Sequence, residues 1–298
     1  MLHYNFDPIY TTWQDPEVMK GLHKFSKPDG MEIIDKVVPG PNGGQDIEVR
    51  IYKPESKDKL PMIMNVHGGG FTTGSYENDN NRVIYLAMHI PAIVVSLNYR
   101  LAPEHVFPDA IEDCYAVWNW MYEVADKIGG DKNKMGLFGT SAGGNLCAGL
   151  AFYVRDHGGP KISLNALNVP ALGIGPSLSG EQMRFDAPVI SGQGLAEGIR
   201  RYIGGLNGML PSYYAVPNVA LDFSDLPATL IVTAEYDPLR DESIAYAEKL
   251  MKDAIPIELY LMPRVGHGFD AVQAPMTDWI HDGVVRAFKR EFSANVEK

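Results

Sequence analysis

The sequence predicts an α/β fold in which a mostly parallel, doubly wound sheet follows an N-terminal antiparallel hairpin. From about residue 60 onwards, short apolar runs alternate with amphipathic helical patterns, an order typical of parallel sheets with helices on both faces. Before that point, two β-rich runs flank a cluster of turn-forming residues. The chain has 298 residues, of which 45% are hydrophobic, so it can bury a large core and we expect a single domain.

The hairpin is predicted from the runs Glu32–Val38 and Asp46–Tyr52, with the glycine- and proline-rich segment Pro39–Gly44 as the turn. Six further apolar runs have the length and the aliphatic character of strands that are buried on both faces of a parallel sheet. These runs are Met62–Val66, Ile93–Leu97, Met135–Phe138, Leu164–Val169, Leu230–Ala234 and Ile257–Leu261.

Helices are expected between these runs. In Ala110–Ala125 the apolar residues fall at steps of three and four and form one stripe, as in an amphipathic helix. The other predicted helices are Ala142–Arg155, Leu239–Lys252 and Pro275–Phe292.

Two segments interrupt the alternation of strands and helices. Residues 1 to about 30 precede the first strand, and residues about 171–225 are rich in Gly, Pro, Ser, Tyr and Met, with one short helix predicted near Leu195–Ile203. Long insertions in a compact domain are commonly functional, so both segments are interpreted as parts of a cap over the site. An ordinary surface excursion remains the alternative.

The run Gly139–Gly143 has the pattern G-x-S-x-G and lies between a predicted strand and a predicted helix. Small residues in this context allow a sharp turn that exposes the serine hydroxyl. Ser141 is therefore the candidate nucleophile for acyl transfer, and it needs a base within hydrogen-bond reach.

A second glycine motif, His67–Phe71, follows the predicted strand that ends at Val66. Backbone N–H groups without side chains can approach a substrate oxygen and stabilise the negative charge that develops on it. We expect the oxyanion donors to be the N–H groups of Gly69, Gly70 and Ala142. A triple glycine can also cradle phosphate, but neither nucleotide-binding glycine pattern follows a strand here, and no metal-binding pattern occurs. No cofactor or metal is expected.

The candidate base is His267, which lies between glycines after the last predicted strand. Asp237 comes directly after the preceding strand, whereas Asp241 and Glu242 already lie in the following helix. Only a carboxylate at the end of the strand easily reaches a histidine on the neighbouring loop, so Asp237 is predicted to orient His267. The chain order Ser, Asp, His is that of α/β hydrolases.

The composition of the chain limits the expected cellular location and the kinds of binding partner. The net charge of −11 argues against nucleic acid or an anionic membrane as a main partner. Cys114 and Cys147 fall in apolar helical patterns and are expected to be buried free thiols. The first residues lack the pattern of a signal peptide, and no run is long enough to span a bilayer, so a cytoplasmic protein is expected. The sequence leaves open whether the chain forms a homodimer.

Five motifs together resemble those of the hormone-sensitive-lipase-like family of bacterial esterases (bacterial family IV). They are His67–Phe71, Tyr99–His105, Gly139–Gly144, Asp237–Asp241 and His267–Phe269. The resemblance spans about residues 60 to 292 and implies an α/β-hydrolase fold, no cofactor and hydrolysis of short-chain carboxylic esters through an acyl-enzyme. It also implies a catalytic triad of Ser141, Asp237 and His267 beneath a small cap. One departure is Thr140, since many members have Asp before the serine.

Alternatives to an esterase remain at this point. A carbohydrate or small-molecule deacetylase, an amidase or a lipase would use the same three residues. A lipase is the least favoured, because nothing in the sequence indicates a broad lipid-adsorbing surface. A non-catalytic ligand-binding protein on the same fold would be expected to lack the base, whereas His267 is present.

Overall fold

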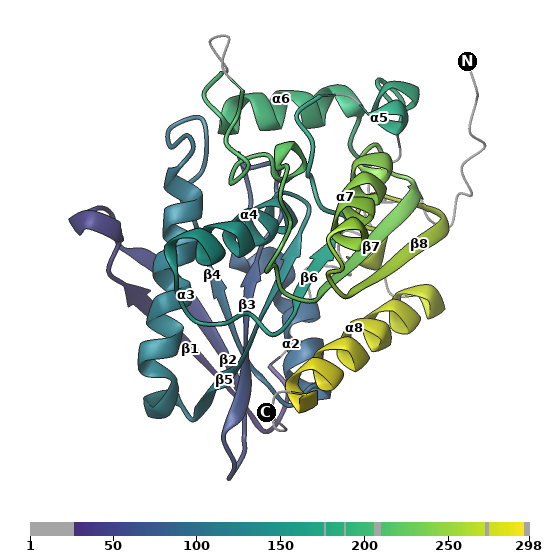
Figure 1. Cartoon of the computed structure of the whole chain (residues 1–298). Coiled ribbons are helices and arrows are strands. Elements are labelled where there is room, and N and C mark those ends of the chain that lie inside the picture. Colours follow the sequence, from purple (N-terminus) through teal and green to yellow (C-terminus); the bar gives the residue numbers. More distant parts are fainter. Residues whose placement is uncertain (1–26, 176, 188, 206–209, 272–273, 295–298) are drawn as a thin grey trace.

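The computed structural model describes residues 27–175, 177–187, 189–205, 210–271 and 274–294, which form one eight-stranded sheet with helices on both sides (Figure 1). The strands are β1 (Met31–Val38), β2 (Ile47–Pro54), β3 (Leu60–Val66), β4 (Ile93–Leu97), β5 (Gly130–Thr140), β6 (Asn165–Asn168), β7 (Thr229–Tyr236) and β8 (Ile257–Gly266). The α-helices are α2 (Asn80–His89), α3 (Asp109–Ile128), α4 (Ala142–His157), α5 (Leu178–Gln182), α6 (Gly192–Tyr202), α7 (Arg240–Lys252) and α8 (Pro275–Ala294). The 3₁₀ turns are η3 (Pro41–Gly43), η4 (Tyr76–Asp79), η5 (Pro217–Val219) and η6 (Phe269–Ala271).

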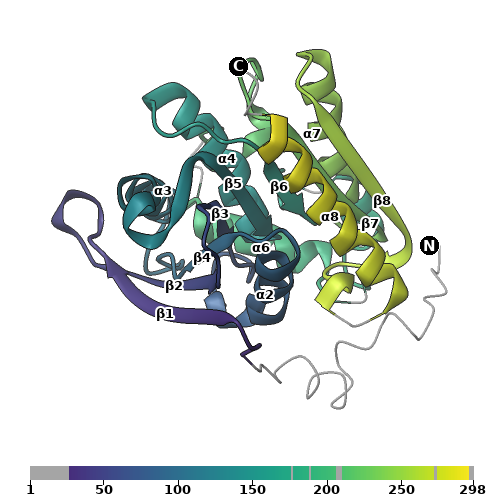
Figure 2. The same ribbon diagram turned by 90° about the horizontal axis from the view of Figure 1, so that it is seen from below.

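The strand order is β1-β2-β4-β3-β5-β6-β7-β8, and the sheet twists strongly along this order (Figure 2). β1 pairs with β2 antiparallel, from Met31 opposite Pro54 to Val38 opposite Ile47, and β2 pairs antiparallel with β4. All the other pairs are parallel. The predicted fold class, with its N-terminal hairpin and its mostly parallel sheet, is confirmed.

The central strands are buried on both faces because each face carries its own apolar layer of helices. In β3, Met62 and Met64 pack into the core under α3, α4 and α7, whereas Ile63 between them packs into the core under α2 and α8. Helix α3 presents Ile111, Cys114 and other apolar residues of its predicted stripe to the first core. Both cysteines, Cys114 and Cys147, are buried and free, as expected.

Three features differ from the sequence-based expectation. β8 is an edge strand, so Leu259 and Leu261 are 39% and 49% exposed and the prediction of burial on both faces is wrong there. Helix α2 is not among the predicted helices. A local signal for it exists, because Ser75 and Asn78 form a capping box at η4, directly before this helix. Helix α5 was not predicted either, because it is only five residues long.

The segment 171–225 contains α5, α6 and η5, and α5 and α6 lie beyond the carboxyl ends of the strands, at the top of Figure 1. The predicted helix at Leu195–Ile203 corresponds to the longer α6. Most of the other segment interpreted as cap, residues 1 to about 30, lies outside the described residues. No helix in the described part of the chain is both long and apolar enough to cross a membrane.

Candidate active site

Ser141 occupies a sharp turn between β5 and α4. Its backbone angles, φ 55° and ψ −116°, fall in a region that residues with a side chain rarely adopt. The turn lifts the side chain out of the sheet at its carboxyl edge. This is the strand-turn-helix context that the G-x-S-x-G pattern predicts.

The flanking glycines are required because the helix begins directly against the sheet. A Cβ on Gly143 would lie 2.0 Å from the carbonyl oxygen of Val66 in β3, and a Cβ on Gly139 would lie 2.3 Å from the carbonyl oxygen of Gly143. Real Cβ atoms do not approach backbone so closely. Any larger residue at these positions would therefore push α4 away from the sheet and displace Ser141.

Three side chains from three different loops are joined by hydrogen bonds. His267 follows β8, and its Nε2 lies 2.9 Å from the Ser141 Oγ. Asp237 follows β7, and its Oδ2 lies 2.9 Å from the His267 Nδ1. Because a carboxylate only accepts hydrogen bonds, Nδ1 carries the proton and Nε2 is free to accept the hydrogen of the Ser141 hydroxyl.

All three side chains lie in buried surroundings, and Asp237 is completely inaccessible. Its second oxygen, Oδ1, accepts a hydrogen bond from the Leu239 N–H at 2.9 Å, which fixes the orientation of the carboxylate. Burial alone would lower the pKa of His267, but the carboxylates of Asp237 and, further away, Asp270 raise it above its ordinary value. The site therefore stabilises an imidazolium.

The glycine loop after β3 lies against the serine turn. A Cβ on Gly68 would be 3.1 Å from the Thr140 carbonyl oxygen and 3.3 Å from the Ser141 Cβ. Gly69 and Gly70, the two predicted donors on this loop, line the same cleft as Ser141 and His267. The third, Ala142, is the first residue of α4, where a backbone N–H has no partner within the helix.

Contacts between His67 and Tyr99 hold the start of the glycine loop in place. The rings of His67 and Tyr99 are stacked with centroids 4.3 Å apart, and the Tyr99 hydroxyl donates to the His67 carbonyl oxygen at 3.0 Å. Burial lowers the pKa of His67, and its Nδ1 lies 2.7 Å from the Gly68 carbonyl oxygen, so this nitrogen donates. His67 thus anchors the glycine loop through Gly68 and Tyr99.

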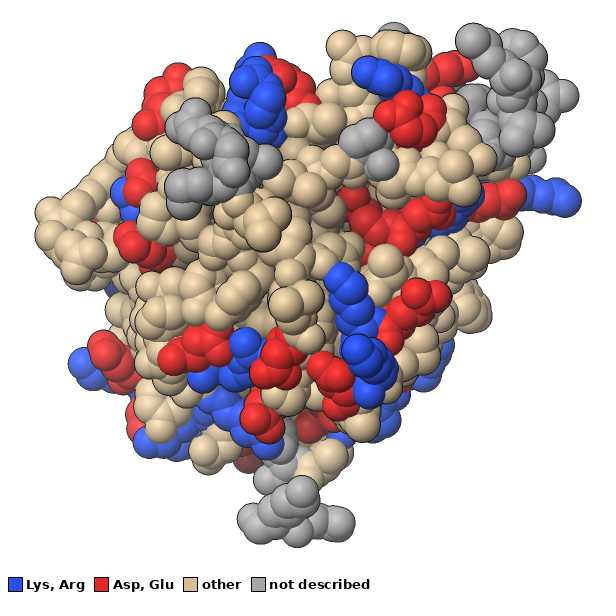
Figure 3. Space-filling view, turned by 45° about the horizontal axis from the view of Figure 1, so that its top comes forward, with Lys and Arg blue, Asp and Glu red and all other residues tan. Residues whose placement is uncertain are grey.

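The cleft in front of these groups has a volume of about 1430 Å³ and is bounded on one side by α6. Figure 3 turns the top of the molecule in Figure 1 forward, and there the acidic and basic side chains are interspersed around a broad surface of other residues.

Within the described residues, no group of three or more His, Cys, Asp or Glu side chains could hold a metal ion.

The other acids of the segment after β7 have structural partners. Asp241 accepts a hydrogen bond from the Ser179 N–H of α5 at 2.7 Å. Glu242 is buried, and it accepts from the Leu172 N–H at 2.6 Å. In the segment Tyr99–His105, Arg100 pairs with Asp113 of α3. None of these acids contacts His267.

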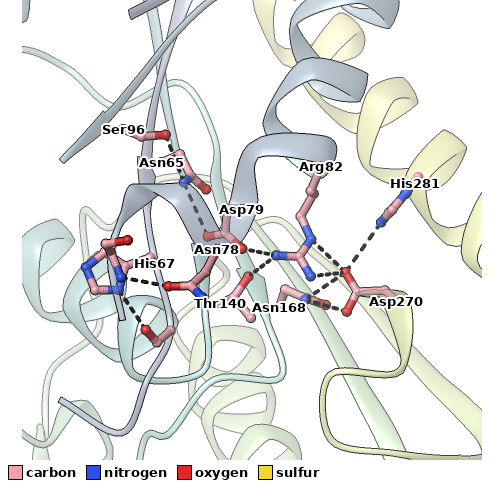
Figure 4. Close-up of polar contacts among 12 residues, drawn as sticks. Asn65, His67, Asn78, Asp79, Arg82, Ser96, Thr140, Asn168, Asp270 and His281 are labelled. Carbon is pink, nitrogen blue, oxygen red and sulfur yellow. Dashed lines mark hydrogen bonds and ion pairs between the residues drawn. The ribbon is translucent and has the colours of Figure 1, made fainter. Parts of the chain in front are cut away.

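A buried polar network beside the serine turn was missed by the sequence analysis (Figure 4). It connects the end of β5, the end of β6, helix α2, helix α8 and the loop that carries His267. Its members are Asp79, Arg82, Thr140, Asn168, Asp270 and His281. The one signal for it in the sequence was an acid three residues after His267.

Comparison with known proteins identifies the family. Residues 63–271 match the family described as alpha/beta hydrolase fold. The chain is 37% identical over 241 residues to the carboxylesterase NlhH of Mycobacterium tuberculosis, covering 79% of this chain and 75% of the relative. It is 34% identical over 220 residues to an arylesterase of Saccharolobus solfataricus, covering 71% and 69% of the two chains.

Solved structures agree with this assignment. A hyperthermophilic esterase from the archaeon Pyrobaculum calidifontis superimposes with a TM-score of 0.80 at 34% identity, covering 87% of this chain and 85% of that one. A bacterial heroin esterase gives 0.87 at 29% identity, covering 95% and 90%. The chain belongs to the α/β-hydrolase family. Within that family it is a hormone-sensitive-lipase-like carboxylesterase.

Proposed function

We propose that this carboxylesterase hydrolyses short-chain carboxylic esters with Ser141 as nucleophile, His267 as general base and Asp237 as the residue that orients and stabilises the imidazole. The observation that carries the proposal is the unbroken hydrogen-bond series from Asp237 through His267 to the Ser141 Oγ, with both distances at 2.9 Å. A serine hydroxyl is a weak nucleophile until a base accepts its proton, and this series supplies the base.

The proposed reaction has two halves. His267 takes the proton of Ser141 as Oγ attacks the ester carbonyl, and it then returns that proton to the departing alcohol. The same histidine activates a water molecule that hydrolyses the acyl-enzyme and regenerates Ser141. Asp237 stabilises the imidazolium that forms in each half, in keeping with the raised pKa of His267.

The oxyanion donors are proposed to be the N–H groups of Gly69, Gly70 and Ala142. The close approach of the glycine loop to the serine turn supports this assignment, because the donors must surround the carbonyl carbon that Ser141 attacks. Each such donor contributes on the order of 100- to 1000-fold to turnover in enzymes of this kind.

The preference for a short acyl group is supported by a small pocket of about 30 Å³ between α6 and the start of α7, lined mainly by apolar residues such as Leu195 and Leu239. Ala171, another lining residue, donates its N–H to the Ser141 carbonyl oxygen at 3.2 Å, so the pocket adjoins the serine turn. A pocket of this volume is too small for a long acyl chain. We propose that α5 and α6 act as a cap that closes this side of the site.

The test is hydrolysis of p-nitrophenyl acetate, butyrate and octanoate by the wild type and by Ser141→Ala. The variant should lose turnover on all three and should no longer be labelled by a serine-directed phosphonate. Ser243→Ala is the matched control, because Ser243 is also buried but donates only to the Leu239 carbonyl oxygen. Turnover retained by Ser141→Ala would refute the nucleophile, and faster hydrolysis of octanoate than of acetate would refute the acyl preference.

A further inference from the structure

Asp270 is a buried carboxylate on the loop that carries His267, and it belongs to η6, three residues further along the chain. Its oxygens accept hydrogen bonds from three other elements. Arg82 of α2 donates through Nε at 2.8 Å, Asn168 at the end of β6 donates through Nδ2 at 3.1 Å, and the Nε2 of His281 in α8 lies 3.4 Å away (Figure 4).

The same partners hold the strand ends on either side of Ser141. Arg82 donates through Nη1 to the Thr140 Oγ1 at 3.1 Å, and Thr140 directly precedes Ser141. The backbone N–H of Ser141 donates a hydrogen bond to the backbone carbonyl oxygen of Asn168 at 2.9 Å. Asp270 is therefore linked to the serine turn twice, once through Arg82 and once through Asn168. Because Asp270 lies on the loop of His267, these contacts join that loop to the serine turn.

The charge of Asp270 is maintained by its partners. Burial alone would raise the pKa of Asp270, but Arg82, together with His281 and Asn168, holds that pKa well below its ordinary value. Arg82 also pairs with Asp79, so this single guanidinium faces two carboxylates.

We propose that Asp270 is a positioning residue for the reaction: bound by Arg82 and Asn168, it fixes the loop of His267 relative to Ser141 and adds a second carboxylate charge that acts on the imidazole. This inference rests on the proposed role of His267 as general base. Asp270 makes no contact with the reacting atoms, so its effect reaches the chemistry through His267. A displacement of a catalytic group by about 1 Å can reduce turnover on the order of 100-fold.

Asp79 provides a matched comparison within the same network. Both carboxylates are buried, and both form an ion pair with Arg82. Asp79 differs because it belongs to η4 and its other polar partner is Asn65, at 3.4 Å. Neutralising either acid removes one partner of Arg82, but only Asp270 is attached to the loop of His267.

The experiment compares Asp270→Asn with Asp79→Asn on p-nitrophenyl butyrate across pH, together with the melting temperature of each. We expect both variants to melt below the wild type. The kcat of Asp270→Asn should fall further than that of Asp79→Asn, by at least about tenfold, with KM little changed.

The pH dependence of kcat/KM distinguishes an electrostatic effect on His267 from a purely structural one, because a purely structural role of Asp270 would not shift the acid limb. The charged groups that raise the pKa of His267 are Asp237, on the loop after β7, and Asp270; Arg82 and His281 face Asp270. Neutral His267 is the active form, so losing the Asp270 charge lowers that pKa and moves the acid limb of kcat/KM to lower pH. Asp79→Asn should leave the limb at the wild-type position.

A kcat of Asp270→Asn less than about tenfold below that of Asp79→Asn, or an acid limb at the wild-type pH, would overturn the proposal. If Asp270→Asn does not fold, His281→Ala and His281→Gln replace it, because glutamine restores a donor that alanine removes. The proposal then requires kcat to fall in the alanine variant and to recover in the glutamine variant. His267→Asn tests the proposed function separately, since activity retained there would refute the base itself.

Discussion

Gly198 of α6 lies so close to Gly70 of the glycine loop that a Cβ on residue 198 would be 2.9 Å from the Gly70 carbonyl oxygen. The contact continues along the helix, where Tyr202 stacks on Phe71 with ring centroids 4.3 Å apart. The Tyr202 carbonyl oxygen also accepts the Phe107 N–H at 2.7 Å. Helix α6 is thus fastened directly onto the loop that is proposed to hold the oxyanion.

Gly198→Ala should therefore reduce turnover without removing any functional group. The added methyl group must displace either α6 or the Gly70 carbonyl group. Movement of Gly70 also shifts its own N–H, which is proposed to bind the oxyanion. We expect kcat to fall on the order of tenfold, less than the loss of a whole donor. Gly194→Ala on the same helix is the control, because its Cβ would meet its nearest neighbours at 3.5 Å, an ordinary contact. A full kcat for Gly198→Ala would show that the contact does not constrain the loop.

The identity of the orienting acid can be tested with a pair of substitutions in one segment. Asp237→Asn should reduce kcat by about 10³- to 10⁴-fold, because an amide at this position favours the wrong tautomer of His267. Asp241→Asn should retain most of the activity, since Asp241 pairs with Arg240 and receives the Ser179 N–H. Steady-state kinetics on p-nitrophenyl butyrate decides between them, and equal losses in the two variants would contradict the assignment.

Glu242 should make the fold less stable as the pH rises. Burial raises the pKa of Glu242 to about 8 from an ordinary value of 4.5, although the N–H groups of Gly173 and Leu172 oppose the shift. Between these two pH values the unfolded chain has released the proton while the folded chain retains it. The free energy of unfolding therefore falls as the pH rises through this window.

Urea unfolding of the wild type and of Glu242→Gln at pH 5 and pH 8 measures this effect. The difference in free energy of unfolding should change in favour of the glutamine variant as the pH rises, because glutamine does not titrate. Asp241→Asn, one residue earlier and partly exposed, is the control. A difference that stays constant between the two pH values would contradict the predicted titration of Glu242.

Much of the fold could be predicted because its strands carry a local signal. The run Ile93–Leu97 is continuous and aliphatic, and it coincides with β4, which is buried throughout. The run Ile257–Leu261 is interpreted in the same way although it contains Glu258 and Tyr260, and it opens the edge strand β8. The run itself does not reveal whether a further strand will pair with it, so its burial could not be predicted.

The chemistry of the site was visible for a different reason. Ser141 and the glycine loop need particular neighbours in sequence, and such motifs are local. Arg82 and Asp270 are 188 residues apart, and each resembles an ordinary surface charge when the sequence is read alone. Their pairing follows from the position of α2 beside the loop after β8. That position is a property of the tertiary structure, and no motif encodes it.

At Ser141 the backbone conformation favours glycine, whereas the proposed chemistry requires a side chain with a hydroxyl. Its φ of 55° and ψ of −116° match the first central position of a type II′ turn, which glycine adopts freely and a residue with a Cβ resists. A chain selected for durability alone would place glycine there and would lose its nucleophile. The reactive hydroxyl of Ser141 therefore depends on a strained backbone at the same residue.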